Sequence, residues 1–438
     1  MLKSALKTSG TRTVSPEETI LRAKPLAERY GVTRVSDITG LDRVRIPVFS
    51  AIVPRSGDFI SVYSGKGGRR EDALAGAYME AVERQTVLRA TPPMIAASAA
   101  VLRKEARIVE PADIVTALAT RWHDDREYRW IEGIDLIGQE PVWVPAAAAG
   151  YCWRTLPGGS PFRRITTHGM AAGNCFEEAV AQALCEIVER DAWTLAELSN
   201  YWWPRALAEH RLGRDPVNDF LDDFERSPCI DFTGIGGGLE NIMRRFHRAG
   251  LLPVVRDISS DLGIPVVVAA VADDDVPGFP QAHMGVGAHP ELRVAAVRAL
   301  TEAAQSRCGD IQAVREDIAP AEGNGDAAGI AVHTRRAKSI DRRRWLLTPS
   351  SRMRSWREIT QRQNPDILAD IELILSRLRD AGIRQVVVVD FSPPDSGLYV
   401  VRVIAPGAEM WIADHGRFGE RAAAFWRSLG TGEEAAHA

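Results

Sequence analysis

Apolar and polar residues follow one another along this chain in two rhythms, which separate predicted helices from predicted strands. Apolar residues spaced three and four apart indicate helices, at 16–30, 70–88, 176–200, 239–249, 291–314, 364–381 and 416–428. Short runs rich in Val, Ile and aromatic residues indicate strands, at 44–53, 128–137, 141–149, 229–235, 252–257, 264–272, 384–391 and 398–404. Because helices and strands are interleaved without a strict βαβ order, we expect a mixed α/β fold.

The predicted helix at 176–200 carries one narrow polar stripe. Its other positions are apolar almost all round, which is typical of a buried helix. The polar positions recur every three or four residues and share one face: Asn174, Glu178, Gln182, Glu186 and Glu189. A polar stripe usually faces solvent, but here the apolar arc is too wide, so we expect the stripe to face an internal cavity. The predicted helix at 291–314 also has a polar face, formed by Arg298, Glu302 and Gln305.

One short acidic phrase occurs twice, as "YMEAVER" at 78–84 and "LCEIVER" at 184–190. If the two helices face each other, they present four carboxylates: Glu80, Glu83, Glu186 and Glu189. A hard cation such as Mg²⁺ relieves their repulsion and usually arrives with phosphates, whose oxygens Arg190 can bind. A metal–phosphate site is therefore one explanation of the repeat, and structural ion pairs are the other.

Composition excludes several classes of protein. The chain has 438 residues, 45% apolar and 26% charged, with a net charge of −4, so it lacks the basic character of a general nucleic-acid binder. Its five cysteines are odd in number and include no CxxC pair, which argues against a zinc knuckle and a disulfide framework. No run of eighteen apolar residues and no signal peptide occurs, so we expect a cytoplasmic protein without a membrane partner.

Two glycine-rich segments do not match known phosphate-binding motifs. "SGKGG" at 64–68 lacks the spacing of a P-loop and the Ser or Thr that would follow Lys66. "GIGGGL" at 234–239 follows a predicted strand, but Leu239 replaces the third glycine of a dinucleotide fingerprint. A glycine-rich turn between a strand and a helix is the better explanation of the second segment.

Four phrases resemble the YcaO family, whose members use ATP to activate peptide backbone amides. They are "GKG" with "AYMEAVER", "HGMAAGNCFEEAVAQALCEIVERDA", "GVGAHPELRVAAVRALTEAAQSR" and "DSGLYVVRVIAPG". With two N-terminal stretches they cover most of residues 12–410. The resemblance implies a YcaO fold, in which mixed sheets and helices enclose an internal ATP site with Mg²⁺ between the two glutamate-bearing helices.

The resemblance also implies roles for individual residues. The expected magnesium ligands are Glu80, Glu83, Glu186 and Glu189. The expected catalytic residues are Glu83, Glu186 and Arg307. The expected nucleotide-binding residues are Arg12, Thr19, Lys66, Asn174, Glu178, Gln182, Arg190 and Arg307. Gly76 stands where the family usually has a serine, so a hydroxyl group near ATP is missing.

The expected organisation has three parts: an N-terminal extension at 1–55 that closes over the nucleotide, a catalytic domain at 56–415, and a C-terminal helix with a frayed tail at 416–438. The last residues, "GTGEEAAHA", lack the proline-rich tail of azoline-forming members. In this respect the chain resembles members that make thioamides with a TfuA partner.

We therefore expect a homodimeric enzyme that acts on a ribosomally made peptide or protein, with a sulfide donor and a TfuA-like partner. An azoline-forming cyclodehydratase with a separate partner is the second hypothesis. A third is a scaffold that binds ATP or a leader peptide without catalysis, although a scaffold would not need four magnesium carboxylates. A Rossmann oxidoreductase comes last, because its fingerprint is incomplete.

Overall fold

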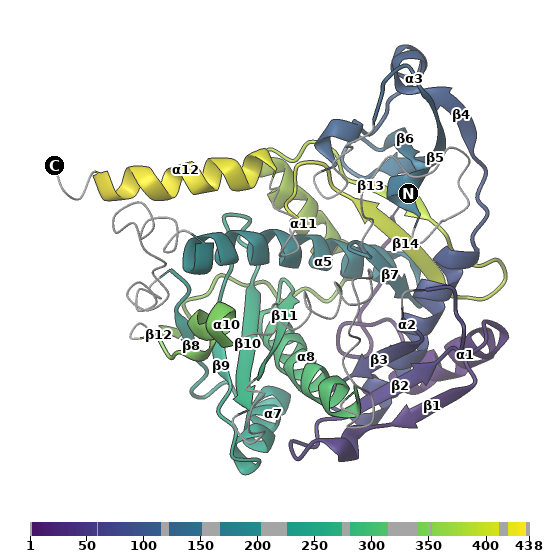
Figure 1. Ribbon diagram of the computed structural model, residues 1–438. Coiled ribbons are helices and arrows are strands. Elements are labelled where there is room, and N and C mark those ends of the chain that lie inside the picture. The colour runs from purple at the N-terminus through teal and green to yellow at the C-terminus, as the bar shows by residue number, and fades with distance from the viewer. Residues whose placement is uncertain are drawn as a thin grey trace, which may run out of the picture.

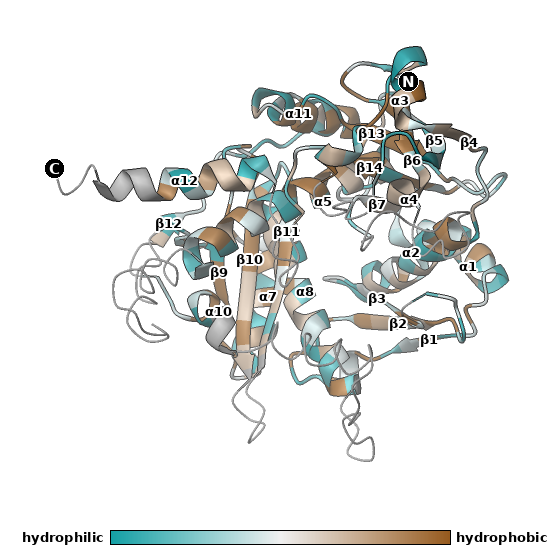
Figure 2. Cartoon of the chain, turned by 45° about the horizontal axis from the view of Figure 1, so that its top comes forward, coloured by the Kyte–Doolittle hydropathy of each residue, from teal (hydrophilic) through white to brown (hydrophobic). Residues whose placement is uncertain are grey.

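The structure, a computed structural model, confirms the mixed α/β fold. It describes residues 2–58, 60–114, 122–150, 167–202, 226–273, 281–313, 340–350, 353–410 and 419–434. Within these residues the chain forms three sheets, and the long helix α5 (Phe176–Glu197) runs through the centre among them (Figure 1). Apolar residues of strands such as β2 and β13 are buried, and the hydrophobic segments of the chain are brown in Figure 2.

The N-terminal part is a three-stranded antiparallel sheet covered by two helices. α1 (Pro16–Arg29) begins where the Ser15 side chain accepts a hydrogen bond from the Glu18 N–H at 3.2 Å, which caps the helix. α1 packs on α2 (Arg70–Arg89), and α2 lies on the sheet. The sheet has the order β1 (Arg34–Asp37), β2 (Val48–Ile52) and β3 (Val62–Lys66).

The second sheet joins segments from both halves of the chain, all antiparallel. Its order is β4 (Ile95–Ser98), β5 (Glu127–Asp135), β13 (Val387–Asp390), β14 (Tyr399–Ile404) and β7 (Met170–Gly173), with β6 (Glu140–Pro145) paired to β5. One face packs into a hydrophobic core with α2, and the other packs into a core with α5 and α11 (Ile367–Asp380). The sheet therefore separates the two glutamate-bearing helices while both remain in contact with β7 and β14.

The third sheet lies on the opposite side of α5. Its order is β11 (Gln281–Ala288), β10 (Val266–Asp273), β9 (Val254–Asp257), β8 (Cys229–Asp231) and β12 (Met353–Ser355), antiparallel except between β8 and β12. α7 (Gly237–Arg248) and α8 (Leu292–Ala313) pack against it through a shared apolar core. Because β8 and β9 are antiparallel, the glycine-rich 234–239 segment is a turn and not part of a dinucleotide-binding βαβ unit.

Glycine allows α8 to lie directly on β11. A Cβ atom added at Gly285 would lie 2.3 Å from the Ala299 carbonyl oxygen, and one added at Gly287 would lie 2.3 Å from that of Ala295. Real side chains do not approach backbone atoms so closely, so these positions accept only glycine. β11 also contacts α5, so α8 and α5 are both positioned by this strand.

Other elements differ from the sequence prediction. The predicted strand 141–149 ends early, because the four buried alanines of α4 (Ala146–Ala149) form a helical turn. The helix predicted at 416–428 instead spans Glu420–Glu434, as α12, and residues 435–438 of the tail expected to fray lie outside the described residues. Figure 1 shows this helix extending away from the rest of the molecule. Helices α3 (Ala99–Glu105) and α10 (Ile340–Leu347) complete the larger elements.

Candidate active site

Helix α2 and strand β3 position the first pair of glutamates. The Ser64 N–H of β3 donates a hydrogen bond to Glu80 Oε2 at 3.2 Å. From the other side, Gln305 Nε2 of α8 donates to the Ser64 carbonyl oxygen at 2.7 Å. β3 is thus hydrogen-bonded to both α2 and α8. Glu80 and Glu83 lie three residues apart on α2, and both are half-buried.

Helix α5 positions the second pair. The Gly169 N–H donates to Glu186 Oε2 at 3.1 Å. Arg190 Nη2 lies 3.3 Å from Glu189 Oε1 and 3.7 Å from Glu186 Oε1. Most of α5 is fully buried, while Glu186, Glu189 and Arg190 are half-buried.

The four glutamates influence one another across the two helices. Burial, followed by the charges of Glu80 and Glu186, raises the pKa of Glu83 well above its ordinary value. Burial also raises the pKa values of Glu80 and Glu186, and it raises that of Glu189 to about 8. The repeated phrase therefore places two halves of one acidic cluster together, and nearby arginines do not fully neutralise it.

A fifth carboxylate, Glu302, joins this cluster from α8. Lys66 Nζ lies 2.5 Å from Glu302 Oε2. Glu302 in turn contributes to the raised pKa values of Glu80 and Glu189. The sequence had placed Glu302 on a polar helix face without giving it a role, and the structure shows that this face meets the acidic cluster.

Sequence reasoning missed one buried cation, Arg402. It lies on β14, is 4% exposed, and favours the charged forms of Glu83 and Glu186. The signal in the sequence was an arginine inside the apolar strand "YVVRVI". A charged residue at such a position is rarely buried without a partner, so it marks a site.

The donor set fits magnesium brought in with phosphates. Among the described residues, no three His, Cys, Asp or Glu side chains are grouped closely enough to hold an ion alone. Mg²⁺ at nucleotide sites is usually held by one or two carboxylates plus phosphate oxygens, and so needs no such cage. The buried carboxylates with raised pKa values supply oxygen ligands and an excess of negative charge, and both suit this cation.

Glu178 organises the other end of the stripe. It accepts hydrogen bonds from the Thr13 N–H and, at 2.6 Å, from Thr13 Oγ1. It also accepts from the Asn174 N–H and Nδ2 at 2.8 and 3.0 Å, and Arg12 Nη1 lies 3.7 Å away. Burial alone would raise the pKa of Glu178, but Arg12 and these hydrogen bonds lower it. Gln182 lies beside Glu178 and Arg12 in the same small cavity.

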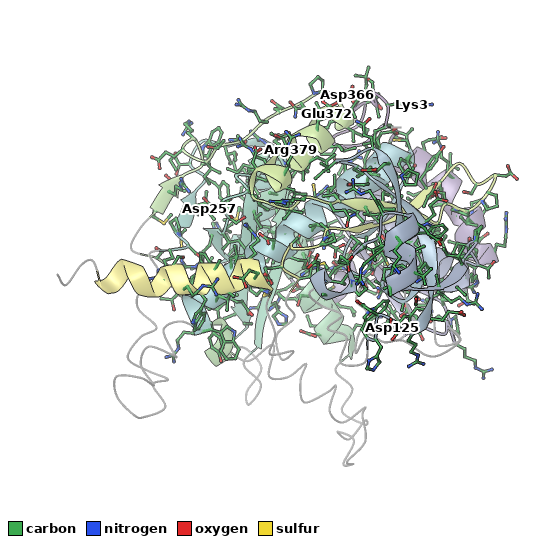
Figure 3. All side chains as sticks on the ribbon, turned by 90° about the horizontal axis from the view of Figure 1, so that it is seen from above. Lys3, Asp125, Asp257, Asp366, Glu372 and Arg379 are labelled. Carbon is green, nitrogen blue, oxygen red and sulfur yellow. The ribbon has the colours of Figure 1, made fainter. Side chains whose placement is uncertain are left out.

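The segment before α1 holds Arg12 at this position. The Lys3 N–H donates to Glu177 Oε1 at 2.8 Å, and the Ala5 N–H donates to Asp366 Oδ1 at 2.8 Å. Figure 3 shows Lys3 and Asp366 at the same edge of the molecule. Since Glu177 belongs to α5 and Asp366 caps α11, the segment ties two helices together across the site.

Two other predicted site residues, and the arginine of the first acidic phrase, have different neighbours. Arg307 is buried, and its Nε lies 3.1 Å from Asp42 Oδ2. Thr19 is buried in α1, where its Oγ1 donates to the Ser15 carbonyl oxygen at 3.0 Å. Arg84 lies 3.4 Å from Asp58, whereas its counterpart Arg190 contacts glutamates. The two acidic phrases thus share their glutamates but not the role of their arginines.

Comparison with known families matches this geometry. A family model described as a YcaO cyclodehydratase that binds ATP and Mg²⁺ matches residues 64–409. The chain belongs to the YcaO family. ATP and Mg²⁺ are the cofactors of this family, and its members are ATP-dependent enzymes.

Relatives and solved structures extend this assignment. A protein of Methanothermobacter thermautotrophicus is 34% identical over 93% of this chain and 97% of its own. A protein from the tfuA 3′ region of Rhizobium leguminosarum bv. trifolii is 33% identical over 92% of this chain and 89% of its own. YcaO from Methanopyrus kandleri, bound with AMPPCP and Mg²⁺, superposes with a TM-score of 0.66 at 23% identity over 95% of this chain and 98% of its own.

A heterocyclase in complex with substrate and cofactor also shares the fold, with a TM-score of 0.70 at 23% identity. The match covers 93% of this chain but only 54% of the heterocyclase, so this YcaO chain spans about half the length of that protein.

Among the described residues, no helix is both long and apolar enough to cross a membrane.

Proposed function

We propose that this YcaO protein uses ATP to activate a backbone amide in a ribosomally made peptide or protein, and that external sulfide then gives a thioamide. The observation that carries the amide-activating function is the five-carboxylate cluster shared by α2, α5 and α8 in a chain of this family. The thioamide product and a TfuA-like partner are supported by the 33% identical relative from the tfuA 3′ region.

The chain's own residues supply positions and charges for this reaction. ATP, when bound, supplies the phosphoryl group that converts the amide oxygen into a leaving group. Glu80, Glu83, Glu186 and Glu189 would hold Mg²⁺, and Arg190, already beside two of them, would bind phosphate oxygens. Because these groups come from helices packed on both faces of one sheet, they are fixed before the substrate arrives.

Residues at the other end of the stripe would hold the remainder of the nucleotide. We assign this role to Arg12, Asn174, Glu178 and Gln182, with Lys66 beside the metal cluster. Arg307 would have to leave Asp42, or bind phosphate while still paired with it, to take part. Thr19, whose hydroxyl is bonded within α1, would contribute indirectly, by stabilising the helix that covers the site.

Product mass tests the proposal. The protein is incubated with a TfuA-like partner, candidate peptide, ATP, Mg²⁺ and sulfide. Thioamidation replaces the amide oxygen by sulfur and adds about sixteen mass units per site, whereas cyclodehydration removes one water molecule, about eighteen mass units. Loss of eighteen units without sulfide would replace this proposal with the azoline-forming one. ATP binding without any change in mass would favour the scaffold hypothesis.

A further inference from the structure

The arginines of the two acidic phrases have different partners, although the phrases are otherwise alike. Arg190 follows Glu186 by four residues on α5, and its Nη2 lies 3.7 Å from Glu186 Oε1. Arg84 follows Glu80 by the same four residues on α2, a spacing at which oppositely charged side chains of a helix can meet. Arg84 Nε lies 3.4 Å from Asp58 Oδ2, in the segment between β2 and β3. Asp58 therefore distinguishes the two halves of the acidic cluster.

Asp58 is fixed beside Arg84 by buried groups of β3 and α2. Its side chain is fully buried, and that of Arg84 is nearly so. Tyr63 of β3 is itself buried, and its hydroxyl donates a hydrogen bond to Asp58 Oδ2 at 3.0 Å. Gln85 Nε2 of α2 in turn donates to the Tyr63 hydroxyl oxygen at 2.7 Å. Two neighbouring residues of α2 thus reach Asp58, one directly and one through Tyr63.

Arg84 already affects the magnesium-side carboxylates of its own helix. Burial raises the pKa values of Glu80 and Glu83, and the charge of Arg84 opposes this rise at both. Glu80 lies one helical turn before Arg84, the spacing of the ion pair seen in the second phrase. A buried guanidinium that loses its carboxylate partner is unfavourable, so without Asp58 the charge of Arg84 would be compensated by these glutamates. A cluster neutralised in this way would bind a cation less well.

We propose that Asp58 is a positioning residue of the magnesium site: it pairs with Arg84 and thereby leaves the two glutamates of α2 available to the cation. The inference rests on the proposed placement of Mg²⁺ between α2 and α5, and it adds a residue from outside the repeated phrases. Asp58 need not touch the metal or the nucleotide, because it acts through the charge of Arg84. The second phrase differs, since Arg190 remains beside its glutamates and is the arginine assigned to phosphate oxygens.

Nucleotide binding with and without Mg²⁺ tests this role. Calorimetry gives the Kd of a non-hydrolysable ATP analogue in the presence of Mg²⁺ and in the presence of a chelator. The ratio of the two Kd values measures the coupling between cation and nucleotide. For Asp58→Asn, which keeps the volume, we expect this coupling to fall about three- to tenfold, because Arg84 then neutralises the glutamates. Loss of packing alone would weaken binding in both conditions and leave the coupling unchanged.

The double variant Asp58→Asn/Arg84→Gln removes both the carboxylate and the cation that would compete with Mg²⁺. We expect its coupling to return to within about twofold of the wild type, which a purely structural role of Asp58 would not produce. Arg84→Gln alone keeps Asp58 and should have a coupling at least as large as that of the wild type. This variant also keeps the proposal testable if Asp58→Asn does not fold.

Asp257→Asn is the matched control. Asp257 is also a buried carboxylate paired with an arginine, since its Oδ2 lies 2.8 Å from Arg354 Nη1. It belongs to β9 in the third sheet and lies outside the acidic cluster. The coupling of this variant should match that of the wild type.

Unchanged coupling in Asp58→Asn would overturn the proposal, as would a double variant that folds but recovers no coupling. So would a decrease in Arg84→Gln as large as that in Asp58→Asn. A wild-type protein that binds the analogue equally well with and without Mg²⁺ would instead remove the magnesium placement on which the inference rests. None of these results depends on which product the enzyme makes, since no peptide is present, so the thioamide proposal can fail while this one stands.

Discussion

At the scale of single residues, identical side chains in this protein differ because their neighbours differ. Glu178 is fully buried, yet Arg12 and hydrogen bonds lower its pKa, so its charged form is stabilised by groups of the protein. Glu186 lies two turns further along the same helix, and burial raises its pKa. The first residue already has its partners, whereas the second still needs a cation.

Replacing Glu186 by glutamine tests whether this residue binds a cation. Glu186→Gln keeps the volume and removes one charge from the cluster. We expect ATP turnover to fall by at least about a hundredfold, because a magnesium ligand is lost, while the melting temperature stays within a few degrees, because repulsion is relieved. Glu240→Gln, on the exposed face of α7, is the control. Full ATPase activity in the Glu186 variant would remove the two-helix magnesium model.

At the scale of elements, the site depends on how closely strands approach helices. Gly65 of β3 lies against the backbone of α2: an added Cβ would be 2.0 Å from the Ala73 oxygen and 2.1 Å from the Ala77 nitrogen. A Cβ added at Gly76 would be 3.3 Å from Gly65 Cα, so the two glycines pack against each other. This contact gives Gly76, at the usual serine position, a packing role.

The same contact predicts a strong effect of Gly65→Ala. Backbone atoms cannot yield as a flexible side chain can, so β3 must move away from α2 and take Lys66 with it. We expect a loss of about 1–3 kcal/mol or more in the free energy of unfolding, measured with urea, and weaker ATP binding. Gly68→Ala is the control, because its nearest neighbour would be Ile242 Cδ1 at 4.0 Å. Equal stability of the two variants would contradict the close packing.

At the scale of the whole molecule, the acidic cluster links stability to pH. Glu189 has a pKa of about 8 in the folded protein, above its unfolded value, because burial disfavours its charge. Its stabilising contribution is therefore complete below the unfolded pKa of about 4.5 and is lost as pH rises towards 8. His168 and His289 act in the opposite sense below about pH 6.5, since burial lowers their pKa values.

We therefore expect the melting temperature of the cation-free protein to fall between pH 7 and 8.5. The melting temperature of the wild type should fall by roughly one to three degrees more than that of Glu189→Gln, because the variant has no charge to bury at this position. Mg²⁺ with ATP should raise the melting temperature more at pH 8.5 than at pH 7, since it neutralises the charged form. Calorimetric scans of both proteins measure this, and parallel curves would rule out the buried charge at Glu189.

The sequence by itself determined the helix α5 and its stripe, because burial of nearly every other position leaves only one face for Glu186 and Glu189. It also determined that two helices carry the same pair of glutamates, and long apolar runs such as 264–272 were enough to find the central strands. These features follow from local spacing, which a folded helix or strand keeps.

Only the tertiary structure decided what those residues meet. β11 was not predicted, because glycine has a low strand propensity and the packing of α8 on Gly285 and Gly287 is a tertiary contact. Arg84 and Arg190 occupy the same place in the repeated phrase, yet one contacts Asp58 and the other two glutamates. Glu302 and Arg402 joined the site from elements far apart in the chain. Charge interactions depend on distance in space, and that distance is set by packing and not by spacing along the sequence.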